Sequence, residues 1–218
     1  YFNAVYPDIA VSKSCASCHN NHPSSLKTDY KKGDVMGGIM ITIPLGKDQV
    51  SQPIEKIFLP PKTVADYVHS ILEADRTVYA KYIVNRLQQE NIIYASENWW
   101  EENTLLLPAQ FLLNSSDVIK NSPIKLKFRL ISLWPINNIN GAADDFEKEG
   151  LESVVKNPGK PFSQINLIEN KKIFQAIYPD FAVTPACVSC HNNHPRSPKN
   201  NFKLNDVIGG LVVSFPVN

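Results

Sequence analysis

Residues 187–195 read Cys-Val-Ser-Cys-His-Asn-Asn-His-Pro, and residues 15–23 read Cys-Ala-Ser-Cys-His-Asn-Asn-His-Pro. Both contain Cys-x-x-Cys-His, the attachment motif of a c-type haem. In that chemistry two thiols add to the vinyl groups on one edge of the porphyrin. The next residue is then held beneath the ring as the proximal iron ligand. The sequence therefore predicts two covalent haems, one on Cys15, Cys18 and His19 and one on Cys187, Cys190 and His191.

The likeness continues on both sides of the two motifs at a constant offset and without a gap. Tyr-Pro-Asp at 6–8 recurs at 178–180, and Gly-Gly at 37–38 recurs at 209–210. Roughly half of the aligned positions are identical, which indicates an internal repeat rather than a chance match.

Three other uses of these cysteines compete with haem attachment. A Cys-x-x-Cys redox disulfide of the thioredoxin type lies at a strand-to-helix turn in a βαβ setting, which neither copy has. Structural zinc sites usually draw two ligands from each of two separated pieces, whereas here all four candidates lie within eight residues. A pair of structural disulfides in a secreted domain is the third alternative.

The composition is that of an ordinary globular protein. The 218 residues carry a net charge of +1 and are 43% hydrophobic, which favours neither nucleic acid nor a membrane surface as a partner. No apolar run approaches the length of a membrane span. The chain opens on Tyr1 without Met, which fits a processed chain or a fragment. All four cysteines lie in the motifs, so none is left for another disulfide, and covalent haem attachment predicts a periplasmic or extracellular location.

The patterns predict an α+β fold in which an antiparallel sheet has helices packed to one side. A long helix is expected from Thr63 to about Ile93 and a shorter one from Asp144 to about Lys156. Strands are expected at 1–6, ending at Pro7, at 34–44, within 123–135, and at 206–215. A hairpin is expected at 164–168 and 172–178, and a loop carries each haem motif.

Residues 1–50 raise a physical problem, because two strands and a loop do not form a stable unit alone. We expect this segment to be completed by upstream residues or by another molecule, through domain swapping or head-to-tail assembly. The predicted organisation is an incomplete first unit at 1–50, a linker at 51–61 and a complete unit at 62–218.

Residues 60–218 resemble the c-type-haem-binding, PAS-like domain of bacterial periplasmic proteins, first described as a domain of unknown function. The phrases that carry the resemblance are residues 73–79 (Glu-Ala-Asp-Arg-Thr-Val-Tyr), 107–111 (Leu-Pro-Ala-Gln-Phe), 129–135 (Arg-Leu-Ile-Ser-Leu-Trp-Pro) and 178–195. Residues 1–50 resemble the last part of a second such domain. The resemblance implies a PAS-like antiparallel sheet, a long N-terminal helix and one haem per domain. It also implies a distal cysteine ligand, and this chain has no spare cysteine for that role.

His69 is the leading candidate for the distal ligand of the second haem, because it is the only histidine outside the motifs. A histidine satisfied on a helix surface is the alternative. His22 and His194 are weaker candidates, since they lie on the proximal side of their own haems and could instead cap a turn or bind a propionate. Arg76 and Lys199 are candidates to neutralise propionates, although a solvated charge is the commoner outcome.

Three functions are open. A dihaem c-type cytochrome for extracytoplasmic electron transfer, not an enzyme, is favoured by two haem motifs without an acid-base or nucleophile constellation. Its partners would be other redox proteins or copies of itself, assembled head-to-tail as an oligomer, a multihaem chain or a filament. A haem-based redox or gas sensor is the alternative that the PAS-like resemblance supports. A haem enzyme ranks last, because nothing marks an acid-base group beside an open iron site.

Overall fold

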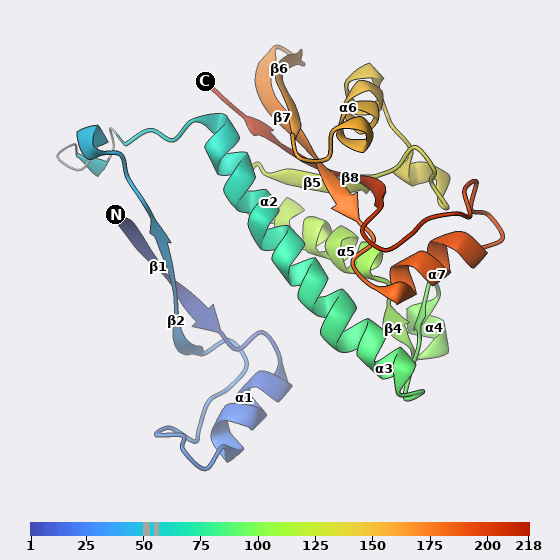
Figure 1. Cartoon of the computed structure of the whole chain (residues 1–218). Helices are drawn as coiled ribbons and strands as arrows, with labels where there is room; N and C mark the ends of the chain where they lie inside the picture. The colour runs from blue at the N-terminus through green and yellow to red at the C-terminus, as the bar shows by residue number, and fades with distance from the viewer. Residues whose placement is uncertain (50–52, 55–56) are drawn as a thin grey trace. The chain divides into compact units, whose positions relative to one another are not determined.

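The computed structural model describes residues 1–49, 53–54 and 57–218. These residues form two compact units, unit 1 (Tyr1–Phe58) and unit 2 (Leu59–Asn218), and Figure 1 labels their elements. The predicted linker at 51–61 lies partly outside the described residues. The predicted combination of helices with antiparallel sheets is confirmed for the main sheet of each unit.

Unit 1 is a pair of antiparallel strands joined by a helix. Strand β1 (Phe2–Ile9) pairs with β2 (Val35–Ile43), and α1 (Lys13–Asn21) lies between them in the sequence. The prediction that Pro7 ends the first strand is wrong, because β1 continues to Ile9. Proline is tolerated in an edge strand, where its missing N–H costs no ladder hydrogen bond. A short 3-10 turn, η1 (Lys47–Gln49), follows β2.

Unit 2 begins with the long helix that the apolar spacing predicts. It runs as α2 (Pro61–Val78), a π-helical stretch η3 (Tyr79–Asn85) and α3 (Arg86–Gln89). Pro61 stands at the first helical position, where the missing N–H has no helical partner to lose. Just beyond the helix Asn91 adopts a positive φ of 53°, the left-handed conformation that commonly ends helices.

A four-stranded antiparallel sheet forms the centre of unit 2. Its order is β5 (Lys127–Ile131), β8 (Val207–Pro216), β7 (Lys171–Phe181), β6 (Phe162–Ile168). The predicted hairpin between β6 and β7 is confirmed. Its two turn residues, Glu169 and Asn170, have φ values of 48° and 62°, which fits the two-residue turn that matches strand twist.

Helices cover both faces of this sheet (Figure 1), so the prediction that they pack to one side is wrong. On one face Ala65 of α2 and Leu112 of α5 (Pro108–Lys120) pack against Tyr178 and Val213. On the other face Leu151 and Val154 of α6 (Asp145–Lys156) pack against Ile177 and Val212. Consecutive residues of β7 are therefore buried on opposite sides, as expected for a strand covered twice.

The remaining elements frame the end of the sheet that carries the second motif. They are β3 (Ala95–Ser96), α4 (Trp99–Glu102), β4 (Leu105–Leu106), η4 (Asn138–Asn140) and α7 (Pro185–Asn193). Strands β3 and β4 pair in parallel over two residues. Among the described residues, no helix combines the length and the apolar character needed to cross a membrane.

Candidate functional site

The second Cys-x-x-Cys-His motif lies on helix α7, not in the loop that the sequence predicts. The Oγ1 of Thr184 caps the helix by accepting a hydrogen bond from the N–H of Cys187 at 3.3 Å. Pro185 follows as a favourable first helical residue. Positions i, i+3 and i+4 of a helix are neighbours on one face. The helix therefore brings the two thiols and the imidazole of His191 to the same side.

The residues after the motif are tied back to it. Asn192 donates from Nδ2 to the carbonyl of Phe202 at 2.9 Å, and its Oδ1 accepts from the N–H of Phe202 at 2.9 Å. The Phe202 ring stands edge-on to the His191 ring with centroids 5.8 Å apart. Phe202 also belongs to a small core with Ala182 and Ile208 beneath Cys187. This framework fixes the orientation of the imidazole.

The first motif has the same local structure on α1. The Oγ of Ser12 accepts from the N–H of Cys15 at 3.3 Å, and Asn20 exchanges two hydrogen bonds with the backbone of Tyr30 at 3.0 and 2.8 Å. The His19 and Tyr30 rings stand edge-to-face with centroids 5.8 Å apart. Both strand pairs also carry a register shift at the same place, after Asp8 and after Asp180. The internal repeat in the sequence is thus a repeat in structure.

A pocket of about 680 Å³ opens beside the second motif, and Cys187, Cys190 and His191 line it. Pockets of this size hold cofactor-sized ligands. Much of the wall is apolar, with side chains from the helices, from β5 and the segment after it, and from β8. These include Val84, Leu107, Leu113, Leu130, Ile131, Trp134, Pro135, Ile136 and Ile208. The pocket therefore offers a largely apolar cavity with two thiols and one imidazole at its edge, which fits a haem.

A buried ion pair stands in the wall of this pocket. The Nη1 of Arg76 lies 2.8 Å from Oδ1 of Asp180, and its Nη2 donates to Oδ2 at 3.1 Å. Only 8% of the Arg76 side chain and 12% of the Asp180 side chain are exposed. Burial raises the pKa of Asp180, although the Arg76 guanidinium opposes this shift. The Nε of Arg76 is buried and has no hydrogen-bond partner among the described residues.

Burial also shifts the pKa values of two motif residues. The pKa of His191 is lowered, first by burial and then by the positive charge of Arg76, which favours the neutral imidazole, the form that binds a metal. Its Nδ1 is buried without a hydrogen-bond partner among the described residues. Burial raises the pKa of the Cys190 thiol. An unsatisfied imidazole beside two free thiols is consistent with a prosthetic group at this position.

The other predicted ligands lie away from the pocket. His69 stacks on Tyr178 with ring centroids 4.0 Å apart, its Nε2 lies 3.7 Å from Glu73, and it does not line the pocket. Its assignment as a distal ligand stays a prediction. Lys199 lies over the rings of Trp134 and Phe202 with its Nζ 5.3 and 4.8 Å from the centroids, and Arg76 is the propionate candidate that lines the pocket.

His22 and His194 take the turn-capping role that the sequence left open. The Nδ1 of His22 accepts from the N–H of Ser24 at 3.2 Å, and the Nδ1 of His194 accepts from the N–H of Arg196 at 3.1 Å. The Nε2 of His194 also lies 3.1 Å from a carboxylate oxygen of Glu97. Among the described residues, no group of three or more His, Cys, Asp or Glu side chains is placed to hold a metal ion.

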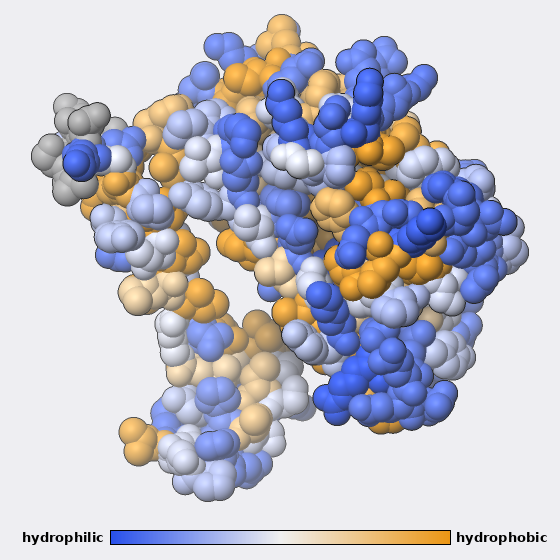
Figure 2. Space-filling view, in the orientation of Figure 1, coloured by the Kyte–Doolittle hydropathy of each residue, from blue (hydrophilic) through white to orange (hydrophobic). Residues whose placement is uncertain are grey.

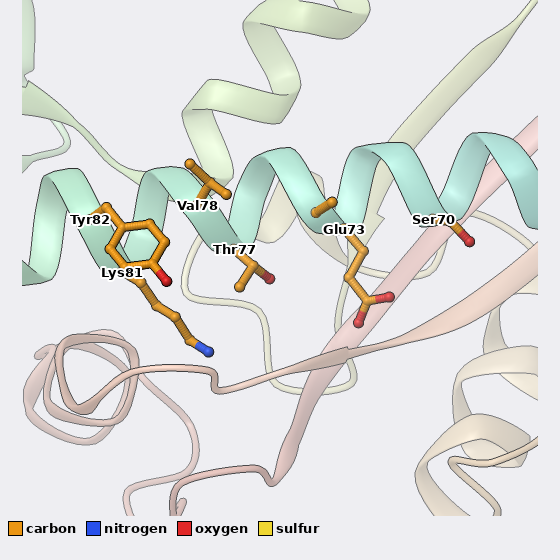
Figure 3. Close-up of a pocket in the computed structure, with 7 residues that line it drawn as sticks. Ser70, Glu73, Thr77, Val78, Lys81 and Tyr82 are labelled. Atoms are coloured by element: carbon orange, nitrogen blue, oxygen red, sulfur yellow. The ribbon is translucent and has the colours of Figure 1, made fainter. Parts of the chain in front are cut away.

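A second, shallower pocket of about 430 Å³ lies on helices α2 and η3. Glu73, Thr77 and Lys81 recur at helical spacing along this face (Figure 3), with Ser70 at one end and Tyr82 at the other. No cysteine or histidine is among its lining residues. The haem motif therefore belongs to the larger pocket.

The pairing of Asp180 with Arg76 and the place of Trp134 in the pocket wall were not predicted from the sequence. The amino-acid sequence nevertheless contained a signal for both. Asp180 belongs to the repeated Tyr-Pro-Asp phrase, and Trp134 stands in the phrase 129–135 that carries the family resemblance. Their meaning depends on long-range contacts, because Arg76 and Asp180 lie 104 residues apart.

Comparison with known proteins returned one family. Residues 1–44 and 55–216 match the model of the family described as Tll0287-like. Among solved structures the chain is similar to the crystal structure of the cyanobacterial heme-protein Tll0287, with 16% identity and a TM-score of 0.49. The similarity covers 72% of this chain and 97% of that chain. No curated protein matches the sequence. The family match includes both Cys-x-x-Cys-His motifs.

Proposed function

The chain belongs to the Tll0287-like family, and from this premise we propose that it is a dihaem c-type cytochrome that transfers electrons outside the cytoplasm. One haem would be attached to Cys15 and Cys18 with His19 as proximal ligand. The other would be attached to Cys187 and Cys190 with His191. The main support for this proposal is the position of His191. Its buried Nδ1 lacks a hydrogen-bond partner among the described residues, and it stands beside two free thiols at the edge of a largely apolar pocket.

Residues of this chain would position the group and shield it from water. The Thr184 cap and the Asn192 hydrogen bonds hold the thiols and the imidazole in place. Apolar residues such as Leu130 and Ile208 exclude solvent from the pocket, and burial of this kind tunes the reduction potential. A haem bound there supplies a one-electron couple. The protein's part is then attachment, orientation and electrostatics.

The proposal extends to domain organisation and assembly. Residues 62–218 form a complete PAS-like haem unit and residues 1–50 the C-terminal part of a second one, joined by the linker at 51–61. The shared hydrogen-bond framework of the two motifs supports this division. Two haems in a short chain suit a link in a longer haem chain, so the partners are redox proteins or further copies. Covalent attachment of haem supports a periplasmic or extracellular location.

Spectroscopy with electron donors tests this function. The purified holoprotein should take up two electrons per chain in a reductive titration and should pass them to an exogenous cytochrome in stopped-flow mixing. A matched variant with Cys15 and Cys18 replaced by alanine should take up one. Uptake of one electron by both proteins, or no transfer to any acceptor, argues against the dihaem carrier.

A sensor of gas or redox state is the second candidate, and one observation favours it. Among the described residues that line the pocket, His191 is the only histidine, and no methionine lines it. His69 is engaged with Tyr178 instead. Carbon monoxide separates the two functions, because an open distal site shifts the spectrum of the reduced haem on CO addition. An iron with two protein ligands leaves the spectrum unchanged and supports the carrier.

A further inference from the structure

The two strand pairs of the repeat differ sharply in burial, although their apolar character is the same. On one face Tyr178 is 4% exposed in unit 2, whereas its counterpart Tyr6 is 53% exposed. On the other face Val212 is 4% exposed and its counterpart Met40 is 67% exposed. Large apolar residues thus lie at the surface along both faces of β1 and β2. Figure 2 shows apolar colour along the strands of unit 1. Contiguous exposed apolar surface of this kind marks an interaction site.

Unit 2 shows which elements cover the faces and edges of such a strand pair. There one face of β7 and β8 is covered by helices α2 and α5, and the other by α6. Strand β5 pairs along the outer edge of β8, and β6 along the outer edge of β7. All of these covering elements come from residues 59–168. The two-stranded sheet of unit 1 has none of them among the described residues of its unit, so its edges remain available for pairing.

Two polar anchors specify the helix that would cover unit 1. In unit 2 the hydroxyl of Tyr178 donates to Asp66 at 2.8 Å, and Asp180 pairs with Arg76. Asp66 and Arg76 both stand on α2, and both contact residues of β7. Unit 1 keeps the tyrosine and the aspartate as Tyr6 and Asp8. The described residues give neither a hydrogen bond nor an ion pair to the Tyr6 hydroxyl or the Asp8 carboxylate. The matching helix therefore carries an acidic side chain and, ten residues on, an arginine.

The repeated glycine pair points to an incoming strand as well. A side chain at Gly209 would meet the carbonyl oxygen of Ile131 at 2.5 Å, because β5 passes close by. At the equivalent Gly37 the nearest atom within 4 Å is Oδ2 of Asp8, at 3.9 Å. Nothing within the described residues of unit 1 approaches Gly37 closely enough to exclude a side chain there. The close approach of a neighbouring strand like β5 would exclude one and would explain the glycine.

We propose that the β1–β2 sheet of unit 1 is a docking surface for a polypeptide segment built like residues 59–168. That segment would bring a long amphipathic helix with the acid–arginine pair, a strand like β5 and a helix like α6. A second copy of this chain is not the occupant, because its residues 59–168 already cover its own β7 and β8. In the partner, the surface of this segment that would contact β1 and β2 must not already be covered by strands of its own. Docking of this kind does not require haem. Copies of this chain would then assemble through units that the partner has already completed.

A fusion protein tests the proposal directly. A second copy of residues 59–172 is placed ahead of Tyr1 of the full chain, which reproduces the spacing of unit 2 because Tyr1 corresponds to Ile173. Amide hydrogen exchange is then measured across β1 and β2 in the holoprotein. We expect exchange there to slow by about a hundredfold or more, toward the rates of β7 and β8, since buried strands open only with the unit around them.

Two variants of the fusion provide the controls. Arg76→Leu in the added copy removes the cation that Asp8 would meet. In this variant, exchange across β1 and β2 should be at least tenfold faster than in the unmutated fusion. Asp29→Asn makes an aspartate change outside the sheet, beside Lys27, and should leave the protection intact.

Each other outcome overturns the proposal. If exchange in β1 and β2 keeps the rate of the unfused chain, the surface does not accept this segment, whether the added copy folds or not. If the unfused chain already protects these strands as its concentration rises, a second copy is the occupant.

Discussion

Replacing Arg76 with leucine leaves the carboxylate of Asp180 buried and unpaired beside the pocket. The ion pair has two short contacts, at 2.8 and 3.1 Å, and both side chains are almost fully buried. Removing one member of such a pair costs about 3–5 kcal/mol of unfolding free energy. With a urea slope of about 2 kcal/mol/M, the midpoint of unfolding should fall by roughly 1.5–2.5 M.

Tryptophan fluorescence is a suitable assay, because all three tryptophans, Trp99, Trp100 and Trp134, lie in unit 2. Arg86→Leu is the matched control. Its partner is Glu90, at 3.2 Å, and both side chains are largely exposed, so its loss should cost at most about 1 kcal/mol. A double variant, Arg76→Leu with Asp180→Leu, should be more stable than Arg76→Leu alone, since no buried charge remains.

The deficit of Arg76→Leu should depend on pH in one direction. Burial raises the pKa of Asp180, and loss of the arginine removes the charge that opposes this shift. An acid whose folded pKa is raised favours folding at low pH and disfavours it as pH rises. The deficit should therefore be smaller at pH 5 than at pH 7. Equal losses for Arg76→Leu and Arg86→Leu, or a double variant no more stable than the single one, would refute the reasoning.

Three further predictions concern packing, titration and attachment. Gly150→Ala would push a methyl group against Ile177 and Phe162 and should cost about 1–3 kcal/mol by urea unfolding, whereas Gly159→Ala, which meets nothing within 4 Å, should be neutral; equal effects contradict the packing of α6. Burial alone would raise the pKa of Asp66, but hydrogen bonds from Lys62 and Tyr178 outweigh it and lower that pKa. The stability that the Asp66 carboxylate contributes is then fully present above its unfolded pKa near 3.8, and it is lost as the pH falls through the lowered pKa of the folded state. Below pH 4, the Tm of Tyr178→Phe should fall less steeply with pH than the Tm of the unmutated protein. An equal pH dependence of Tm in the two proteins would count against this. Cys15→Ala with Cys18→Ala should halve the pyridine haemochrome signal per chain, and a full signal would show that the first motif carries no covalent haem.

Local chemistry made much of this structure predictable from the sequence. The hairpin expected about Glu169 and Asn170 is present, and the amphipathic helix expected from Asp144 to about Lys156 is α6, which Asp144 caps. The fixed spacing of Cys187, Cys190 and His191 likewise brings them together at one pocket. In each case neighbouring residues carry the signal.

Long-range packing was harder to predict. Helix α7 is a short polar helix held by the Thr184 cap, and its sequence lacks the apolar period that would indicate a helix. The covering of both faces of β7 did leave a signal. Residues 173–178 are nearly all apolar without alternation, a pattern typical of strands buried on two sides. Spacing alone could not predict that His69 stacks on Tyr178 outside the pocket, because a helical stripe does not say which end lies beside the site.

Intact mass spectrometry under denaturing conditions tests the central claim most directly. The chain would be produced together with a c-type haem attachment system and unfolded in acid before measurement, so that only covalent groups remain. The account predicts a mass equal to the polypeptide plus two haems, with peptides 15–19 and 187–191 each carrying one. A polypeptide mass without added haem, or with disulfides or zinc in place of haem at the motifs, would contradict it.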